Sequence, residues 1–260
     1  SQKARCLVLL RDGASVGGLV DYLVNTGFCE SRVKVLEALG GPRERITSFA
    51  VNEDHETSFQ HPVCLAVEVR GQGAPVPKAS GLPDALFKTD GVMTKRPVRA
   101  MTLSALAPAS GELLWDIGGG SGSIAIEWLL ADARCEAIAI EPREDRVALI
   151  HANAKALGVD RLQIVTGYAP EVLDDLPKPD AVFIGGGLST GMLSGLEALL
   201  PVGTRVVANA VTLEAEALLT ALHERKGGDL FRVEIAQAGP LGDKTGWKAA
   251  YPVVQWSGAF

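Results

Sequence analysis

The sequence predicts an α/β protein with a doubly wound, mostly parallel sheet that ends in an antiparallel hairpin, preceded by a smaller α/β domain. A strand, a glycine-rich loop and a helix follow one another over residues 113–131. Short apolar runs then alternate with amphipathic segments up to residue 226, which is typical of parallel strands joined by helices. A stretch rich in glycine and proline at residues 71–83 separates this part from the residues before it.

The glycine-rich loop is the most informative segment. Residues 113–115 are apolar and predict a buried strand, which Asp116 ends. Glycines occupy every second position from Gly118 to Gly122 before a helix begins at Ser123. This spacing permits a tight turn and lets a ligand approach the backbone closely, because no Cβ stands in the way. A carboxylate at the strand end favours a ligand that carries positive charge.

The spacing of this loop separates two kinds of ligand. A dinucleotide fold has Gly-x-Gly-x-x-Gly and holds a pyrophosphate at the helix N-terminus. Here the third glycine comes one residue earlier, and Asp116 would repel a pyrophosphate. The ammonium and sulfonium groups of S-adenosylmethionine suit the acid better, and the loop resembles motif I of the class I methyltransferases. A glycine turn that serves only the fold is the alternative for this loop taken alone.

The other elements of this part follow from hydrophobic periodicity. Parallel strands are expected at 135–140, 162–165, 181–184 and 205–208, with helices at 123–131, 145–157, 192–199 and 213–226. Two final strands at 230–237 and 247–255 are joined by a loop too short for a crossover helix, so they should pair antiparallel. This final hairpin favours the methyltransferase version of the doubly wound sheet.

Two further strand ends carry candidate ligand-binding residues. Glu141 follows the strand at 135–140, where ligand crevices form in such sheets, and its carboxylate could accept both hydroxyls of a ribose. The alternative is a solvated loop acid. Gly167 and Ala169 follow the next strand and would leave room for an adenine ring, although an ordinary Gly-Pro turn would have the same composition.

The loop after the fourth strand, residues 185–189, has the sequence Gly-Gly-Gly-Leu-Ser. Many methyltransferases that act on exocyclic amines carry an Asn/Asp-Pro-Pro-aromatic motif here, and this loop has none. The sequence therefore disfavours an amine acceptor and favours a flat substrate that needs close approach to the backbone.

Composition favours a cytoplasmic metabolic enzyme. The 260 residues are 47% hydrophobic, which is ample for two cores, and no apolar run reaches the roughly 20 residues of a membrane helix. The net charge of −6 argues against nucleic acid as a partner. Four scattered cysteines indicate a reducing compartment, and neither they nor the four histidines, His55 included, have metal-binding spacing, so no metal site is expected.

The chain is predicted to divide into residues 1–70, a linker at 71–83, and residues 84–260. Strands are expected at 5–10, 33–36 and 63–69, with a helix at 15–26. About 70 residues are few for an independent domain, and the chain enters a strand almost at once, so the front part resembles half of a larger domain.

Several motifs resemble a known family. Gly-Leu-Pro-Asp at 81–84, Met-Thr-Lys-Arg-Pro-Val-Arg-Ala at 93–100 and Gly-Tyr-Ala-Pro-Glu at 167–171 resemble the C15-methylating, decarboxylating methyltransferases of cobalamin biosynthesis. Residues 35–42 and 44–46 are similar to the C-terminal half of a tetrapyrrole methylase domain. In this order the two parts resemble the precorrin-6Y C5,15-methyltransferases (decarboxylating).

The resemblance implies S-adenosylmethionine as cofactor and no metal. Thr94 enters the cofactor site through the resemblance alone, whereas the glycine loop, Glu141 and Ala169 are also indicated by the residues themselves. The expected cofactor-binding residues are Thr94, Asp116, Gly118, Gly119, Gly120, Ser121, Gly122, Glu141, Gly167 and Ala169.

The resemblance also implies an anionic tetrapyrrole as substrate and a homo-oligomer, a tetramer in the family. An electron-rich carbon of a reduced tetrapyrrole needs chiefly positioning for methyl transfer, and the macrocycle itself can act as electron sink for decarboxylation. No catalytic acid or base is nominated. The candidate cations for the peripheral carboxylates are Lys95, Arg96, Arg99, Lys244 and Lys248. For each of them, the alternative is a solvated charge on the surface.

One departure from the family pattern limits the expected activity. Residues 1–70 contain no glycine-rich cofactor loop of their own, so we expect a chain truncated at its N-terminus that methylates C15 and decarboxylates but does not methylate C5. A class I methyltransferase with another small-molecule or protein acceptor is the main alternative. A nicotinamide dehydrogenase, and a docking role for the front part, are the others.

Overall fold

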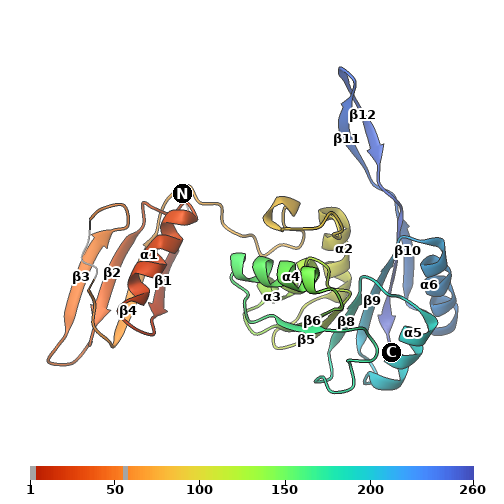
Figure 1. Cartoon of the computed structure of the whole chain (residues 1–260), viewed down its shortest axis with the longest axis horizontal. Coiled ribbons are helices and arrows are strands. Elements are labelled where there is room, and N and C mark those ends of the chain that lie inside the picture. Colours follow the sequence, from red (N-terminus) through yellow and green to blue (C-terminus); the bar gives the residue numbers. More distant parts are fainter. Residues whose placement is uncertain (1–3, 55–57) are drawn as a thin grey trace. The chain divides into compact units, whose positions relative to one another are not determined.

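The computed structural model describes residues 4–54 and 58–260, so His55 and residues 1–3 of the predicted front domain lie outside the described residues. The chain forms two compact units, the first ending at Val76 and the second spanning Pro77–Phe260 (Figure 1). Each unit has its own hydrophobic core. Within the described residues, no helix combines the length and the apolar character that crossing a membrane requires.

The first unit is an antiparallel sheet with one helix. Its elements are β1 (Ala4–Leu9), α1 (Ser15–Asn25), β2 (Arg32–Glu37), β3 (Arg45–Ala50) and β4 (Val63–Val69). The strand order is β1-β4-β2-β3, and neighbouring strands run antiparallel. Val16, Val20 and Leu23 of α1 pack against the alternate valines and leucines of one face of the sheet. The edge strand β3 was not predicted, because its residues lack a clean alternation of apolar and polar side chains.

The second unit has the predicted doubly wound architecture. Its main elements are η1 (Asp84–Leu86), α2 (Arg96–Leu106), β5 (Leu113–Ile117), α3 (Ser123–Ala131), β6 (Glu136–Glu141), α4 (Glu144–Ala156), β7 (Gln163–Thr166), β8 (Ala181–Ile184), α5 (Thr190–Leu199), β9 (Arg205–Ala210), α6 (Leu213–Lys226), β10 (Asp229–Val233) and β13 (Val253–Ala259). The sheet order is β10-β13-β9-β8-β5-β6-β7. The five strands from β5 to β9 all run parallel to one another. β13 runs antiparallel to both of its neighbours, β9 and β10.

Helices cover both faces of this sheet. One core contains residues of α2, α3 and α4, including Leu103, Ile126 and Ile150. The other contains residues of α5 and α6, including Leu196 and Leu219. β5 lies in the middle of the parallel strands. The chain adds β6 and β7 on one side of β5, then crosses over and adds β8 and β9 on the other side. Ligand crevices of doubly wound sheets form at such a reversal, at the carboxyl ends of the strands.

The end of the chain is more elaborate than predicted. β10 and β13 pair antiparallel as expected, but they are not joined by a simple loop. Residues between them form a second hairpin of β11 (Ala236–Leu241) and β12 (Lys244–Ala249), which projects from the sheet as an arm (Figure 1). The predicted strand at 230–237 therefore extends past the end of β10, and the predicted strand at 247–255 begins before the start of β13. The missed breaks lie at residues 234–235 and 250–252, where the chain leaves the main sheet.

Candidate active site

The carboxyl ends of β5, β6, β7 and β8 surround a cavity of about 470 Å³. The loops that follow these strands form most of its wall, and residues 92–94, just before α2, complete it. The structure brings all but one of the expected cofactor residues to this cavity. Those that line it are Thr94, Asp116, Gly118, Gly119, Gly120, Ser121, Glu141, Gly167 and Ala169.

The glycines of the loop after β5 have distinct roles. Gly118 (φ +75°) lies against the second glycine-rich loop, because a Cβ there would come within 2.9 Å of the Gly186 nitrogen. Gly120 (φ +58°) has open space at its Cβ position, with only the Gly118 oxygen within 4 Å among the described residues. The backbone amides of Gly118 and Gly119 both donate to the Ile140 carbonyl, at 2.9 and 3.1 Å, which fixes the loop on the end of β6.

Gly122 is the expected cofactor residue that does not line the cavity. It precedes α3 with φ +75°, and a Cβ at this position would lie 2.9 Å from Cγ2 of Ile150. A glycine is therefore required at this position, because the turn has a positive φ and because α3 packs closely against α4. Sequence spacing alone could not separate this role from ligand contact.

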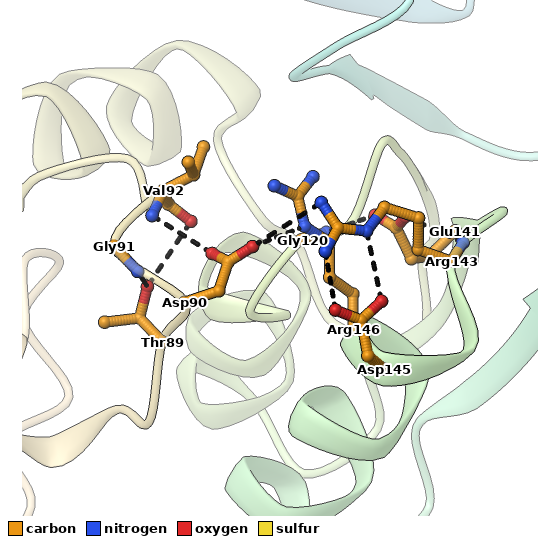
Figure 2. Close-up of polar contacts among 9 residues, drawn as sticks. All are labelled: Thr89, Asp90, Gly91, Val92, Gly120, Glu141, Arg143, Asp145 and Arg146. Carbon is orange, nitrogen blue, oxygen red and sulfur yellow. Dashed lines mark hydrogen bonds and ion pairs between the residues drawn. The ribbon is translucent and has the colours of Figure 1, made fainter.

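Glu141 is a buried carboxylate at the end of β6. One oxygen accepts the Gly120 amide at 2.9 Å and the other accepts the Arg143 amide at 3.1 Å (Figure 2). A carboxylate has about four acceptor positions, so each oxygen can still accept one more hydrogen bond. The arrangement can bind a pair of adjacent hydroxyls while the two amides hold the carboxylate in place.

Asp116 gives the cavity a second buried acid. One of its oxygens accepts the Ala125 amide at 3.1 Å, in the first turn of α3. Burial, with a smaller contribution from the charge of Glu141, raises the pKa of Asp116 to about 7. A cationic group bound in the cavity would favour the ionised form, so this acid can recognise an ammonium or sulfonium charge.

Arg99 corrects one of the expectations for the substrate site. Its side chain is fully buried and forms an ion pair with Glu127, so it is not available to an external carboxylate. Arg99 also donates to Asp84 and to the carbonyls of Leu82 and Thr94. It therefore joins the motifs at 81–84 and 93–100 to α3, and we no longer assign it to substrate.

The other four expected cations do not line the cavity. Lys95 and Arg96 are exposed at the start of α2, whereas Lys244 and Lys248 lie on the projecting strand β12. The cations that do line the cavity are Arg143 and Arg146, which the sequence analysis missed. Their position directly after Glu141, at the start of α4, was the available signal.

Within the described residues, no group of three or more histidine, cysteine, aspartate or glutamate side chains could hold a metal ion. The four cysteines are unpaired. The lining of the cavity includes two buried carboxylates, two glycine-rich loops and two arginines.

Comparison with known proteins identifies the family. Residues 85–259 match the model of the precorrin methyltransferase domain. A Sinorhizobium protein named precorrin-6Y C(5,15)-methyltransferase [decarboxylating] is 52% identical over 258 residues, which are 98% of this chain and 62% of that protein. The chain thus spans less than two-thirds of the length of the curated relatives with this name.

Two further relatives correspond to the second unit. A Pyrobaculum calidifontis protein named "Probable cobalt-precorrin-6B C(15)-methyltransferase (decarboxylating)" is 40% identical over 157 residues, covering 55% of this chain and 77% of that protein. The crystal structure of the C-terminal domain of precorrin-6Y C5,15-methyltransferase from Rhodobacter capsulatus is 55% identical, with a TM-score of 0.69, and covers 71% of this chain and 100% of that one. With its doubly wound fold and the match over residues 85–259, the chain belongs to the precorrin methyltransferase family.

Proposed function

We propose that this chain transfers a methyl group from S-adenosylmethionine to C15 of a precorrin and removes a carboxyl group from a ring acetate of the same substrate. The observation that carries the proposal is the convergence of Asp116, the glycine-rich loop and Glu141 on one cavity in a chain of this family. The names of the relatives supply the substrate class and the decarboxylation.

We assign the cavity residues to three parts of the cofactor. Asp116 would face the cationic amino acid end, Glu141 would accept the two ribose hydroxyls, and the small residues Gly167 and Ala169 would border the adenine ring. The bound cofactor supplies an electrophilic methyl group. The glycine-rich loop lets the backbone approach the ligand closely, which would hold the methyl group in place for transfer.

The substrate's carboxylates need cations outside the cofactor cavity. Lys95 and Arg96 lie exposed at the start of α2, directly after the cavity residue Thr94, and we retain them as candidates for this role. Lys244 and Lys248 lie on the arm and would reach a substrate only if the arm contributes to a site. No general acid or base is assigned.

We infer that the arm of β11 and β12 joins copies of the chain into a homo-oligomer. The register of the two strands puts Ala236, Ala238, Trp247 and Ala249 on one face, while Lys248 lies on the opposite face. The Trp247 side chain is 80% exposed, which is unusual for so large an apolar group. An apolar strand face on a projecting hairpin is suited to pairing with the same face of a second copy.

C5 methylation is not part of the activity that we propose for these 260 residues. The first unit has one connection from a strand to a helix, between β1 and α1, within its described residues. There a Cβ on Gly13 would lie 1.7 Å from the Phe59 carbonyl oxygen, so protein backbone already fills the space next to this turn. This observation supports a single cofactor site per chain, in the second unit.

Calorimetric titration tests the cofactor assignment. We expect S-adenosylhomocysteine to bind with one site per chain and NAD not to bind at the same concentrations. Binding of NAD instead would favour the dehydrogenase alternative, and binding of neither ligand would overturn the proposal.

A further inference from the structure

One wall of the cofactor cavity is a strap, residues 88–94, that leads into α2. Val92, Met93 and Thr94 line the cavity from this side. Arg143 and Arg146, at the start of α4, also line it. The strap and the start of α4 thus border the same space, which the proposed function gives to the cofactor.

Buried polar side chains hold both ends of the strap. At its start, Asn153 accepts the Lys88 amide at 2.7 Å and donates at 2.9 Å to the carbonyls of Lys88 and Ser121. At its end, Arg99 donates to the Thr94 carbonyl. Asn153 and Arg99 are almost completely buried, so neither end can leave its place without exposing unpaired polar groups.

The middle of the strap is held in a different way. One oxygen of Asp90 accepts the Val92 amide at 3.0 Å, and the other accepts Nε of Arg146 at 2.9 Å. Arg143 lies 3.9 Å from the same carboxylate. Figure 2 shows Asp90 between the turn of the strap and the two arginine side chains. A single carboxylate therefore both shapes the turn and ties it to the start of α4.

The turn itself is a compact local unit. The hydroxyl of Thr89 accepts the Gly91 amide at 3.1 Å and donates to the Val92 carbonyl at 3.4 Å. Gly91 has φ +98°, no atom of the described part of the chain lies within 4 Å of its Cβ position, and the Val92 side chain is 63% exposed. The hydrogen bonds described for residues 89–92 therefore join these residues to one another, except for the ion pairs of Asp90.

Exposure distinguishes the middle of the strap from its ends. The side chains of Asp90 and Arg146 are 24% and 20% exposed, so water and salt reach their ion pair. The Val92 amide and the Arg146 side chain hold the pKa of Asp90 below its ordinary value, which keeps the carboxylate charged. The pair can break at modest cost while the buried ends stay fixed.

We propose that Asp90 is a positioning residue that closes the strap over the bound cofactor through its ion pairs with Arg146 and Arg143. The inference rests on the proposed function, which makes this cavity the cofactor site. The closed strap holds Val92 against the ligand, and breaking the ion pair lets the turn at residues 89–92 move so that S-adenosylhomocysteine can leave.

The variant Asp90→Asn isolates the ion pair from the turn. The asparagine keeps an oxygen for the Val92 amide but removes the charge that faces the two arginines. In stopped-flow displacement, we expect S-adenosylhomocysteine to dissociate about fivefold faster from Asp90→Asn than from the wild-type chain, which corresponds to an exposed ion pair at the upper end of its usual strength. Added salt should accelerate dissociation from the wild type and have little effect on the variant.

Two further variants make the test specific. Glu197→Gln breaks the ion pair of Glu197 with Arg225, which joins α5 and α6 outside the cavity lining, and should leave the dissociation rate unchanged. Asp90→Glu retains the charge and should restore slow, salt-sensitive dissociation.

The outcomes separate this inference from the proposed function. If the wild type binds S-adenosylhomocysteine but Asp90→Asn releases it at the wild-type rate with the wild-type salt dependence, the strap inference is overturned and the cofactor assignment stands. If the wild type does not bind this ligand, both are overturned.

Discussion

Glu141 stands at the carboxyl end of β6, where each of its carboxylate oxygens accepts one backbone amide. If it also accepts the ribose hydroxyls, Glu141→Ala should weaken binding of S-adenosylhomocysteine by about 1.5–3 kcal/mol, the usual contribution of hydrogen bonds to a charged group. Calorimetric dissociation constants of the two proteins measure this difference.

Asp180 provides a matched control for Glu141. It accepts the Leu113 amide at 2.8 Å, at the start of β5. This contact therefore lies at the amino ends of the parallel strands, away from the cavity at their carboxyl ends. Asp180→Ala should lower the melting temperature but leave the dissociation constant unchanged. Equal affinities of Glu141→Ala and the wild type would reduce Glu141 to a structural acid of the glycine-rich loop.

Gly120 and Gly158 allow the steric role of the loop to be tested. Both have positive φ, +58° and +70°, and at neither does an atom of residues 4–54 or 58–260 come close enough to the Cβ position to clash. Valine at either position should destabilise the fold by about 1–3 kcal/mol through backbone strain. Only Gly120→Val should abolish binding of S-adenosylhomocysteine, because only that side chain would enter the cavity. Loss of binding by both variants in calorimetry would indicate a general effect on folding.

The raised pKa of Asp116 makes cofactor binding depend on pH. In the free protein this carboxyl is largely protonated below about pH 7 and ionised above it. A cationic ligand favours the ionised form, so binding releases a proton and affinity should rise by up to about tenfold per pH unit below 7 and then level off. Asp116→Asn should bind more weakly and lose this dependence. Titrations with S-adenosylmethionine between about pH 5.5 and 8 test the sign, and a wild-type affinity that falls with rising pH contradicts it.

At the scale of the elements, the parallel strands could be predicted because they are buried on both faces and read as continuous apolar runs. The strand ends then indicated Asp116, Glu141 and the 167–169 turn, which the structure places around one cavity. The arm could not be predicted in the same way. Its residues are exposed, so its sequence carries no pattern of burial, and β3 was missed for a related reason.

The roles of charged side chains could be predicted least well from the sequence. Arg99 was expected to face substrate, but its partner Glu127 lies 28 positions away in the sequence and on another helix. A sequence shows that a charge is present and not whether the fold neutralises it. Arg143 and Arg146 were overlooked although they follow the strand-end acid Glu141 directly, because the sequence does not show which side chains at the start of α4 face the cavity.

The arm gives a prediction at the scale of an element. Trp247→Glu should reduce the molar mass in solution, because a carboxylate on the apolar face of β12 would oppose contact with a second copy. Size-exclusion chromatography with light scattering measures the mass. Val202→Glu is the control, since Val202 is 99% exposed in a turn after α5 and should not affect assembly. An unchanged mass for Trp247→Glu would show that the arm does not join copies of the chain.

At the scale of the whole molecule, the candidate cofactor site lies within one unit. Every residue that lines the cavity belongs to residues 92–192, inside the match to the precorrin methyltransferase domain. The first unit has its own core of α1 and the antiparallel sheet. The proposed reaction therefore depends on residues of the second unit.

The measurement that tests the central claim most directly is mass spectrometry of the product formed by the purified chain from a precorrin-6Y-type substrate and S-adenosylmethionine. The account predicts a gain of one methyl group and the loss of one carbon dioxide per substrate, with the methyl group at C15. Two added methyl groups would contradict the single cofactor site, and an unchanged substrate, with S-adenosylmethionine bound, would contradict the assignment of a precorrin as acceptor.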